Sequence, residues 1–393
     1  MMRINGRDIC SCGFLRVSLR SVIVIFLVAL SNSCGGSKGN ILLTEVREIP
    51  VDGEMPLLEG KELDLEILGA KKLSVCGDWM IVNTSNKNAQ VSLVDLNTLE
   101  EIAGICPEGK AKTDFRYPDF SIRQFVMEDD GHWKMIMKDN WSTIKYIDLT
   151  ESAAQKRTVI DRYFEEEEDT YHMSDYSTVY IDSIRSFIFN GFDYDDGKEC
   201  YVAPKFYCVD DTVKTEVVVF GDLNIKDIDY NNYRSYMRLY ALTGNLYVSP
   251  DRRKFLYACS PTNYLNVIDY ENCSAVTFMP EGGITYERAL ATSPDRSYPD
   301  AMYCCDCAVE NDFFIVLYVN DDVGENGETA SASSCIRVIG WDGSLLGSAK
   351  LDQDFGSMAY DRERNRIFCM DPVYETIYSY DLNGILDLRR DSL

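Results

Sequence analysis

The residues whose types could support chemistry fall mainly in three acidic runs, at residues 165–169, 193–196 and 320–322, all in predicted connecting loops. Carboxylate and carbonyl oxygens are the ligands that Ca²⁺ prefers. Asp193 and Asp195 are therefore candidate metal ligands, although no run has the spacing of a D-x-[DN]-x-[DN]-G calcium loop. Acidic runs also occur in ordinary solvated loops, so the alternative is that these residues form no metal site.

A second candidate site combines cations and aromatic rings at the inner ends of predicted strands. A cation in an acidic protein would select an anionic group of a ligand, such as a uronate or a peptide carboxylate. Aromatic rings suit a saccharide or a peptide in a shallow pocket. The alternative is that each arginine pairs with a neighbouring aspartate and stabilises the fold. The candidate ligand-binding residues are Arg123, Tyr233, Arg238, Tyr286 and Arg288.

Three of the 14 cysteines lie in the N-terminal segment 1–34, and most of the other eleven lie inside apolar strand-like runs, where a free cysteine packs as a small hydrophobic residue. The exception is the run Cys304-Cys305-Asp306-Cys307. Neighbouring side chains of a strand point to opposite faces, so Cys305 is turned away from Cys304, and a site of three thiolates would need a bulge. We therefore interpret the run as a buried strand, with or without one disulfide.

The motifs of common enzymes are missing from the sequence. The chain has two histidines, His132 and His172, which excludes a His-rich zinc site and HExxH, and it has no G-x-S-x-G, P-loop or G-x-G-x-x-G motif. His132 lies in a predicted strand beside Trp133, where a structural role is expected. The sequence thus favours a protein without catalytic activity.

The elements that must position these residues repeat along the chain. A strand-length apolar run, a turn and a second such run precede a strand that closes on aspartate, and this unit occurs six times. Units of this length cannot bury a core alone, so they must stack or close into a ring. The sequence predicts an all-β, six-bladed β-propeller of four-stranded antiparallel blades. The closing aspartates are Asp95, Asp148, Asp210, Asp269, Asp342 and Asp381.

The outer strand of the last blade has two candidate sources. It is either residues 385–388 or the N-terminal segment 42–49, and the latter would close the ring and cover a free edge. The outer strand of the second blade is predicted at 156–160.

The first 33 residues have the features of an export signal. Arginines precede an apolar run at 22–30, which is short for a membrane span but suits a signal peptide, and small residues lead to Cys34. We expect a signal peptide at 1–33 of the lipoprotein type, acylation of Cys34, a flexible tether at 34–41 and the propeller at 42–393. The protein would then be lipid-anchored in the cell envelope, at the outer membrane, and its only membrane contact would be the anchor.

The charge of the chain limits its partners. The sequence has 64 acidic against 39 basic residues and a formal net charge of -25. Such a chain is a poor ligand for nucleic acid or for an anionic membrane surface.

The chain resembles the TolB-like six-bladed propeller lipoproteins of Gram-negative bacteria. The resemblance rests on Cys34 and its preceding signal, on Ser249-Pro250-Asp251 before a Phe-Leu-Tyr strand, and on the strands that end in aspartate. The segment 107–118 is similar to a Gly-Pro-Gly-x-Phe stretch of that family, but 110–112 departs from it. The resemblance implies the fold and implies no catalytic residue.

We expect a non-catalytic, envelope-tethered propeller that binds a glycan, a peptide or an envelope protein. The expected binding surface is the loop face, formed by the connectors between blades and the turns between second and third strands. The first alternative is a Ca²⁺-dependent hydrolase or lyase of the lactonase type, in which Asp193, Asp195 and Glu165 would serve as acid and base. The second is a structural scaffold in an envelope complex. No cofactor other than Ca²⁺ is expected.

Overall fold

The structure is a computed structural model. Between residues 164 and 243 the structure describes the backbone of the strands, and Val179 is the one residue there whose side chain is also described. The described residues are 41–42, 46–50, 55–120, 123–139, 143–165, 175–180, 185–190, 193–195, 200–202, 205–210, 213–219, 224–225, 244–259, 263–269, 274–280, 302–320, 334–371 and 373–386.

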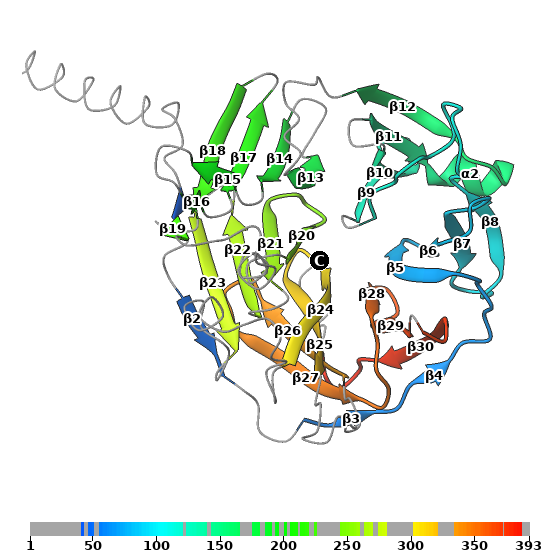
Figure 1. The fold of residues 1–393 in the computed structure, drawn as a ribbon. Helices are drawn as coiled ribbons and strands as arrows, with labels where there is room; N and C mark the ends of the chain where they lie inside the picture. Colours follow the sequence, from blue (N-terminus) through cyan, green and yellow to red (C-terminus); the bar gives the residue numbers. More distant parts are fainter. Residues whose placement is uncertain are drawn as a thin grey trace, which may run out of the picture. The chain divides into compact units, whose positions relative to one another are not determined.

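Five blades of four antiparallel strands are described with their packing, and we name them blades A to E (Figure 1). Blades A and B come first in the chain. Blade A is β5 (Ala70–Cys76), β6 (Trp79–Thr84), β7 (Val91–Asp95) and β8 (Glu101–Ile105), and blade B is β9 (Gln124–Met127), β10 (Trp133–Asp139), β11 (Thr143–Asp148) and β12 (Ile160–Glu165).

Blades C, D and E follow after residue 243. Blade C is β20 (Gly244–Val248), β21 (Lys254–Cys259), β22 (Tyr264–Asp269) and β23 (Ser274–Pro280). Blade D is β24 (Met302–Val309), β25 (Phe313–Asn320), β26 (Ser334–Gly340) and β27 (Leu345–Leu351). Blade E is β28 (Ser357–Asp361), β29 (Arg366–Asp371), β30 (Thr376–Asp381) and, from the N-terminal segment, β4 (Lys61–Glu62).

The prediction of an all-β propeller with four-stranded antiparallel blades is confirmed, but the structure shows five blades with described packing and not the predicted six. The intervening part of the chain forms a sheet with the same order of consecutive strands, whose side chains lie almost entirely outside the described residues. Its strands are β13 (Asp175–Tyr180), β14 (Arg185–Asn190), β17 (Lys205–Asp210) and β18 (Val213–Val219). Three short strands form a separate sheet: β15 (Asp193–Asp195), β16 (Cys200–Val202) and β19 (Asn224–Ile225).

The local sequence of blade C shows why these segments become strands. β21 reads Lys-Phe-Leu-Tyr-Ala-Cys, and five of its six residues are buried, as expected for a strand packed on both faces. The preceding turn is closed by Ser249, whose Oγ accepts a hydrogen bond from the Lys254 amide at 3.0 Å and donates one to Asp251 at 2.6 Å. This Ser-Pro-Asp turn was recognisable in the sequence.

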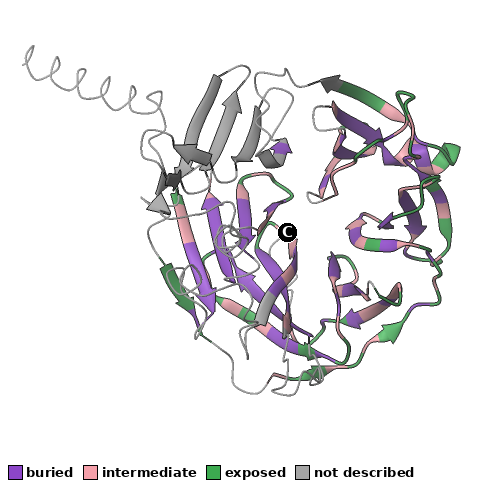
Figure 2. Ribbon diagram, viewed as in Figure 1, coloured by how far each residue is buried: buried purple, intermediate pink, exposed green. Residues whose placement is uncertain are grey.

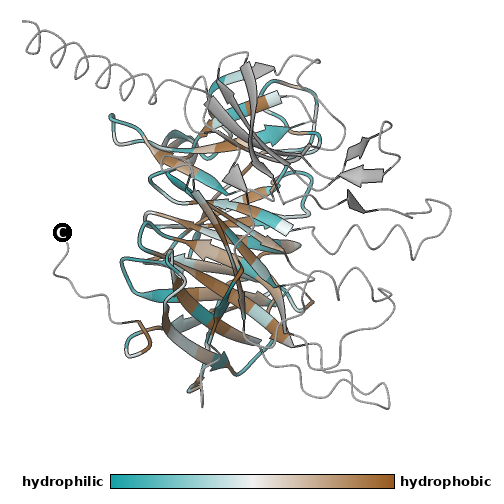
Figure 3. Cartoon of the chain, turned by 90° about the vertical axis from the view of Figure 1, so that its left-hand side faces the viewer, coloured by the Kyte–Doolittle hydropathy of each residue, from teal (hydrophilic) through white to brown (hydrophobic). Residues whose placement is uncertain are grey.

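The core is a series of apolar layers between neighbouring blades. One layer joins blades A and B, and others join E with A, D with E, and C with D. Figure 2 shows buried residues along the strands of these blades, and Figure 3 shows apolar strands between hydrophilic turns. Each blade is therefore held by the side chains of its neighbours, and the first strand of each blade is the innermost.

The N-terminal segment closes blade E, but with other residues than the sequence predicted. β4 pairs with β30, whereas residues 42–49 and 385–388 do not supply this strand. β2 (Val46–Ile49) instead adds a parallel strand to β23 of blade C. β1 (Ile41–Leu42) pairs in parallel with β18, and β3 (Leu57–Leu58) pairs in parallel with β27 of blade D. The segment 41–62 thus runs along the outer edges of successive sheets (Figure 1).

A helix that the sequence analysis missed interrupts blade B. α2 (Leu149–Gln155) begins after Asp148, whose carboxylate accepts a hydrogen bond from the Glu151 amide, and ends at Lys156 in the left-handed conformation. The outer strand of the blade therefore starts at Ile160, not at 156. The Asp-x-x-Glu spacing at the start of the helix is a capping signal that could have predicted it. Among the described residues no helix is long and apolar enough to cross a membrane.

Candidate functional site

A cavity of about 360 Å³ lies among the inner strands, beside the turns that join the first and second strands of blades A, C, D and E and beside the starts of β9 and β10 in blade B. All five described blades contribute to its lining. The lining residues are Ser74–Gly77 of blade A, Arg123–Phe125 and Trp133 of blade B, Tyr247–Pro250 and Arg252 of blade C, Cys307–Glu310 of blade D and Ala359–Glu363 of blade E. The volume is in the range of small-ligand pockets.

The walls of the cavity are largely apolar. Val75, Phe125, Val248 and Val309 are half-buried and line it, and the ring of Trp133 lies against the turn at Gly77. The four half-buried side chains keep part of their surface available to a ligand.

A buried carboxylate, that of Asp306, lies beside the cavity and joins the inner strands. Its Oδ1 accepts hydrogen bonds from the Tyr247 hydroxyl at 3.0 Å and from the Cys307 amide at 2.9 Å. Its Oδ2 accepts from the Ser357 hydroxyl at 3.0 Å and from the Met358 amide at 2.9 Å. Asp306 is 3 % exposed, and these bonds satisfy a charge that would otherwise be costly to bury.

Arg123 supplies the counter-charge. Its Nη2 donates to Asp306 Oδ2 at 2.5 Å, and its Nη1 donates to the carbonyl of Met358 at 2.9 Å. Burial disfavours the guanidinium charge, but the charge of Asp306 outweighs this and raises the pKa of Arg123. The Nε of Arg123 is buried and has no hydrogen-bond partner among the described residues, and its side chain lines the cavity.

A β-bulge aims Asp306 at this network. The pairing of β24 with β25 shifts register between Cys304 and Asp306. The bulge inserts one extra residue, which puts Cys304 and Cys307 on the same face of the strand and brings their sulfurs to 3.7 Å. The sequence analysis recognised that a bulge would be needed to gather thiols here, but it did not identify the role of Asp306.

The mouth of the cavity carries paired charges of both signs. Arg362 contacts Glu310 and Asp312, each at 3.0 Å, and Arg364 contacts Asp78 at 2.7 Å and Asp361 at 3.1 Å. Burial raises the pKa of Glu310, and the hydrogen bond from Arg362 opposes that rise. These pairs join blade E to blades D and A.

A second cation, Lys72, lies on β5, the inner strand of blade A. Its pKa is lowered first by burial and then by the charge of Arg123, while the charges of Asp306 and Asp119 oppose that lowering.

The structure describes one of the five predicted ligand-binding residues, and places it at the cavity. That residue is Arg123, whose pairing with Asp306 also matches the alternative of an arginine that stabilises the fold. Tyr233, Arg238, Tyr286 and Arg288 lie outside the described residues, as does Cys34. Asp193 and Asp195 lie on β15, and their side chains are not described.

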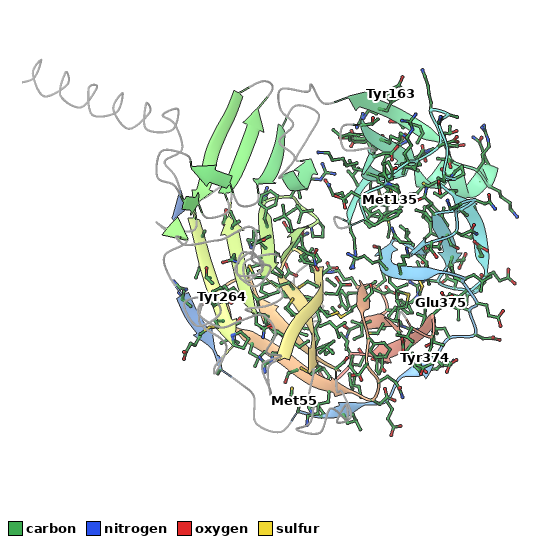
Figure 4. All side chains as sticks on the ribbon, in the orientation of Figure 1. Met55, Met135, Tyr163, Tyr264, Tyr374 and Glu375 are labelled. Atoms are coloured by element: carbon green, nitrogen blue, oxygen red, sulfur yellow. The ribbon has the colours of Figure 1, made fainter. Side chains whose placement is uncertain are left out.

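The cavity opens among the turns between first and second strands, not at the predicted loop face. The structure does not describe the side chain of any residue in the three predicted acidic runs. Blade E does present an acidic groove of about 470 Å³ at that end, lined by Glu62, Asp64, Glu66 and Glu375. Tyr374 beside it is 76 % exposed (Figure 4).

His132 lies immediately before β10, not within a strand as the sequence predicted, and it contacts Asp148. Its Nδ1 lies 2.9 Å from Asp148 Oδ2, and the same oxygen accepts from the buried Lys134 at 2.5 Å. The hydrogen bond to Asp148 raises the pKa of His132. These residues belong to blade B and to the start of α2, and none of them lines the cavity.

Among residues whose side chains the structure describes, no three His, Cys, Asp or Glu side chains are grouped to hold a metal ion. This says nothing of Asp193 and Asp195, so the predicted Ca²⁺ site stays a prediction.

Comparison with known proteins identifies no family and no activity for this chain. No family model matches the chain, and no curated protein matches its sequence. Solved structures match at low identity. An exported protein of Bacteroides fragilis is 11 % identical with a TM-score of 0.47, covering 86 % of this chain and 98 % of that one. A luciferin-regenerating enzyme is 10 % identical with a TM-score of 0.43, covering 81 % and 93 %. The β-propeller domain of Cps50 (Swd1) from Myceliophteria thermophila is 10 % identical with a TM-score of 0.42, covering 82 % and 99 %.

Proposed function

We propose that this chain is a binding protein that seats a short peptide segment in the cavity among its inner strands. The observation that carries the proposal is the buried Nε of Arg123, which has no hydrogen-bond partner in the part of the chain that the structure describes and belongs to a residue lining a cavity of about 360 Å³. A buried donor without an acceptor is destabilising, and a ligand oxygen that accepted from it would remove that cost.

The walls and the mouth of the cavity favour a peptide. The half-buried Val75, Val248 and Val309 would cover an apolar side chain, and Arg123 Nε would meet a backbone carbonyl or a carboxylate. At the mouth, Glu310 and Arg362 offer both an acceptor and a donor, which matches the alternating donors and acceptors of a peptide backbone.

We also propose that the protein is exported and anchored through Cys34, and that the β13–β14–β17–β18 sheet serves as a sixth blade. The first proposal is supported by the signal features of residues 1–34. The second is supported by the order of the strands in that sheet, which matches that of the other blades.

The test is a binding screen with N-acetylated tripeptide amides, Ac-Ala-X-Ala-NH₂, in which X is aliphatic, aromatic, acidic or basic. Calorimetry would measure affinity for the wild type and for Val248→Trp, which would reduce the volume of the cavity. Leu68→Trp is the matched control, because Leu68 is 83 % exposed and is not in the lining of this cavity.

We expect peptides with an aliphatic or aromatic X to bind, and Val248→Trp to weaken them at least about tenfold, a change of about 1.4 kcal/mol. Leu68→Trp should bind as the wild type does. Unchanged binding in Val248→Trp would remove the site from the cavity. Binding of oligosaccharides in place of every peptide would replace the proposal with the glycan alternative.

A further inference from the structure

The strongest feature that binding does not explain is the pair of cysteines on either side of Asp306. Cys304 and Cys307 are 2 % and 1 % exposed, and their sulfurs lie 3.7 Å apart. Both are thiols in the structure. A disulfide needs a sulfur–sulfur separation of about 2.05 Å, so the two atoms would have to approach each other by about 1.7 Å.

The bulge is what makes such a pair available. In a regular strand, residues three apart point to opposite faces and cannot be joined. The register shift between Cys304 and Asp306 removes this obstacle. Cys305 is excluded from the pair, because its sulfur is directed to the carbonyl of Gly356 at 3.4 Å and it packs against the layer between blades D and E.

We propose that Cys304 and Cys307 form an intrachain disulfide that fixes the bulge and thereby holds Asp306 in its network. The Cys307 amide donates to both Tyr247 and Asp306, so a restraint on Cys307 acts on the residues beside the cavity. This inference concerns covalent structure and is independent of whether the cavity binds a peptide.

The chemistry is thiol–disulfide exchange with a small disulfide such as oxidised glutathione. The thiolate of Cys307 attacks one glutathione sulfur and releases one reduced glutathione, and the thiolate of Cys304 then attacks Cys307 and releases the second. Two S–H bonds of the protein and the S–S bond of glutathione are lost, while one protein S–S bond and two glutathione S–H bonds form. Burial raises the pKa of Cys307, so in the folded protein its thiolate is scarce and the exchange is expected to take place during folding.

The test maps the thiols after refolding. The full chain is refolded in a buffer of oxidised and reduced glutathione, denatured, alkylated at acidic pH and digested with chymotrypsin. Cleavage after Tyr303 and Phe313 releases one peptide that contains Cys304, Cys305 and Cys307. We expect this peptide to carry a single alkyl group, at Cys305, and to lack two hydrogens.

Matched variants assign the pair. Cys305→Ser should keep the disulfide, whereas Cys304→Ser should leave Cys307 alkylated. In the wild type, a reductant should lower the melting temperature, and in Cys304→Ser it should not. Three alkyl groups on the wild-type peptide would overturn the proposal, and so would a disulfide that joins Cys305 or Cys335 to either partner.

Discussion

Asp306 offers a sharp test of how the inner strands are held together. The replacement Asp306→Asn keeps the size of the side chain but removes its charge and converts one acceptor oxygen into an NH₂ donor. On the Oδ2 side, that donor would face the amide of Met358, the hydroxyl of Ser357 and the guanidinium of Arg123.

The expected cost follows from what remains buried. The side chain of Arg123 is 14 % exposed, and after the replacement it has no ion-pair partner among the described residues. Removing one partner of a buried ion pair typically costs about 3–5 kcal/mol. We therefore expect Asp306→Asn to lower the free energy of unfolding by about that amount.

The assay is urea unfolding at pH 7, followed by tryptophan fluorescence and circular dichroism. Asp312→Asn is the control, because the side chains of Asp312 and Arg362 are 62 % and 46 % exposed and such a pair contributes at most about 1 kcal/mol. In the double variant with Arg123→Met, the buried guanidinium is absent. The double variant should therefore lose about 1–3 kcal/mol less stability than the sum of the losses of the two single variants. A loss for Asp306→Asn no larger than for Asp312→Asn would refute the assigned role of the carboxylate.

Two further predictions concern blade B and the contact between blades C and D. The hydrogen bond to Asp148 raises the pKa of His132 above its unfolded value, so its contribution to stability is complete below about pH 6.5 and is lost as pH rises through the folded pKa. Melting temperatures of the wild type and His132→Gln between pH 5.5 and 8.5 should therefore converge as pH rises, and a constant difference would contradict the assignment. Gly343 has φ +87° and a Cβ there would meet the ring of Phe278, so Gly343→Ala should cost about 2–3 kcal/mol in urea unfolding. Gly131→Ala, at φ +81° with nothing near, should cost about 1 kcal/mol, and equal losses would show that the packing against Phe278 is unimportant.

The blades were predictable from sequence because their signals are local. Apolar runs alternate with turns such as Ser249-Pro250-Asp251, and the predicted closing residues Asp95, Asp148, Asp210, Asp269 and Asp381 each end a strand of the structure. The errors occurred where a competing local signal was overlooked, as at α2, or where pairing is long-range. The residues of β4 are Lys61 and Glu62, and nothing in this charged dipeptide indicates that it pairs with a strand more than 300 residues later in the chain.

The site was predictable only in part, for a similar reason. Arg123 could be selected as a cation near an inner strand, but its partner Asp306 is 183 residues away and lay within a run that attracted attention for its cysteines. Tyr247 and Ser357 have no distinguishing sequence feature, since they resemble any strand tyrosine or serine. Their role depends on a register shift in β24. From the sequence, such a bulge could be stated only as a requirement for bringing the three thiolates together.

The segment 41–62 has a mechanical consequence. It pairs in turn with β18, β23, β27 and β30 before the chain enters β5. A pulling force applied at residue 41 would load these pairings one after another, beginning with the two-residue contact of β1 and then the four-residue contact of β2. The blades themselves would carry the load only after β4 had separated from β30. The strand pairings of the segment would thus break one after another under force, and the inner strands would bear tension only after the last of them had separated.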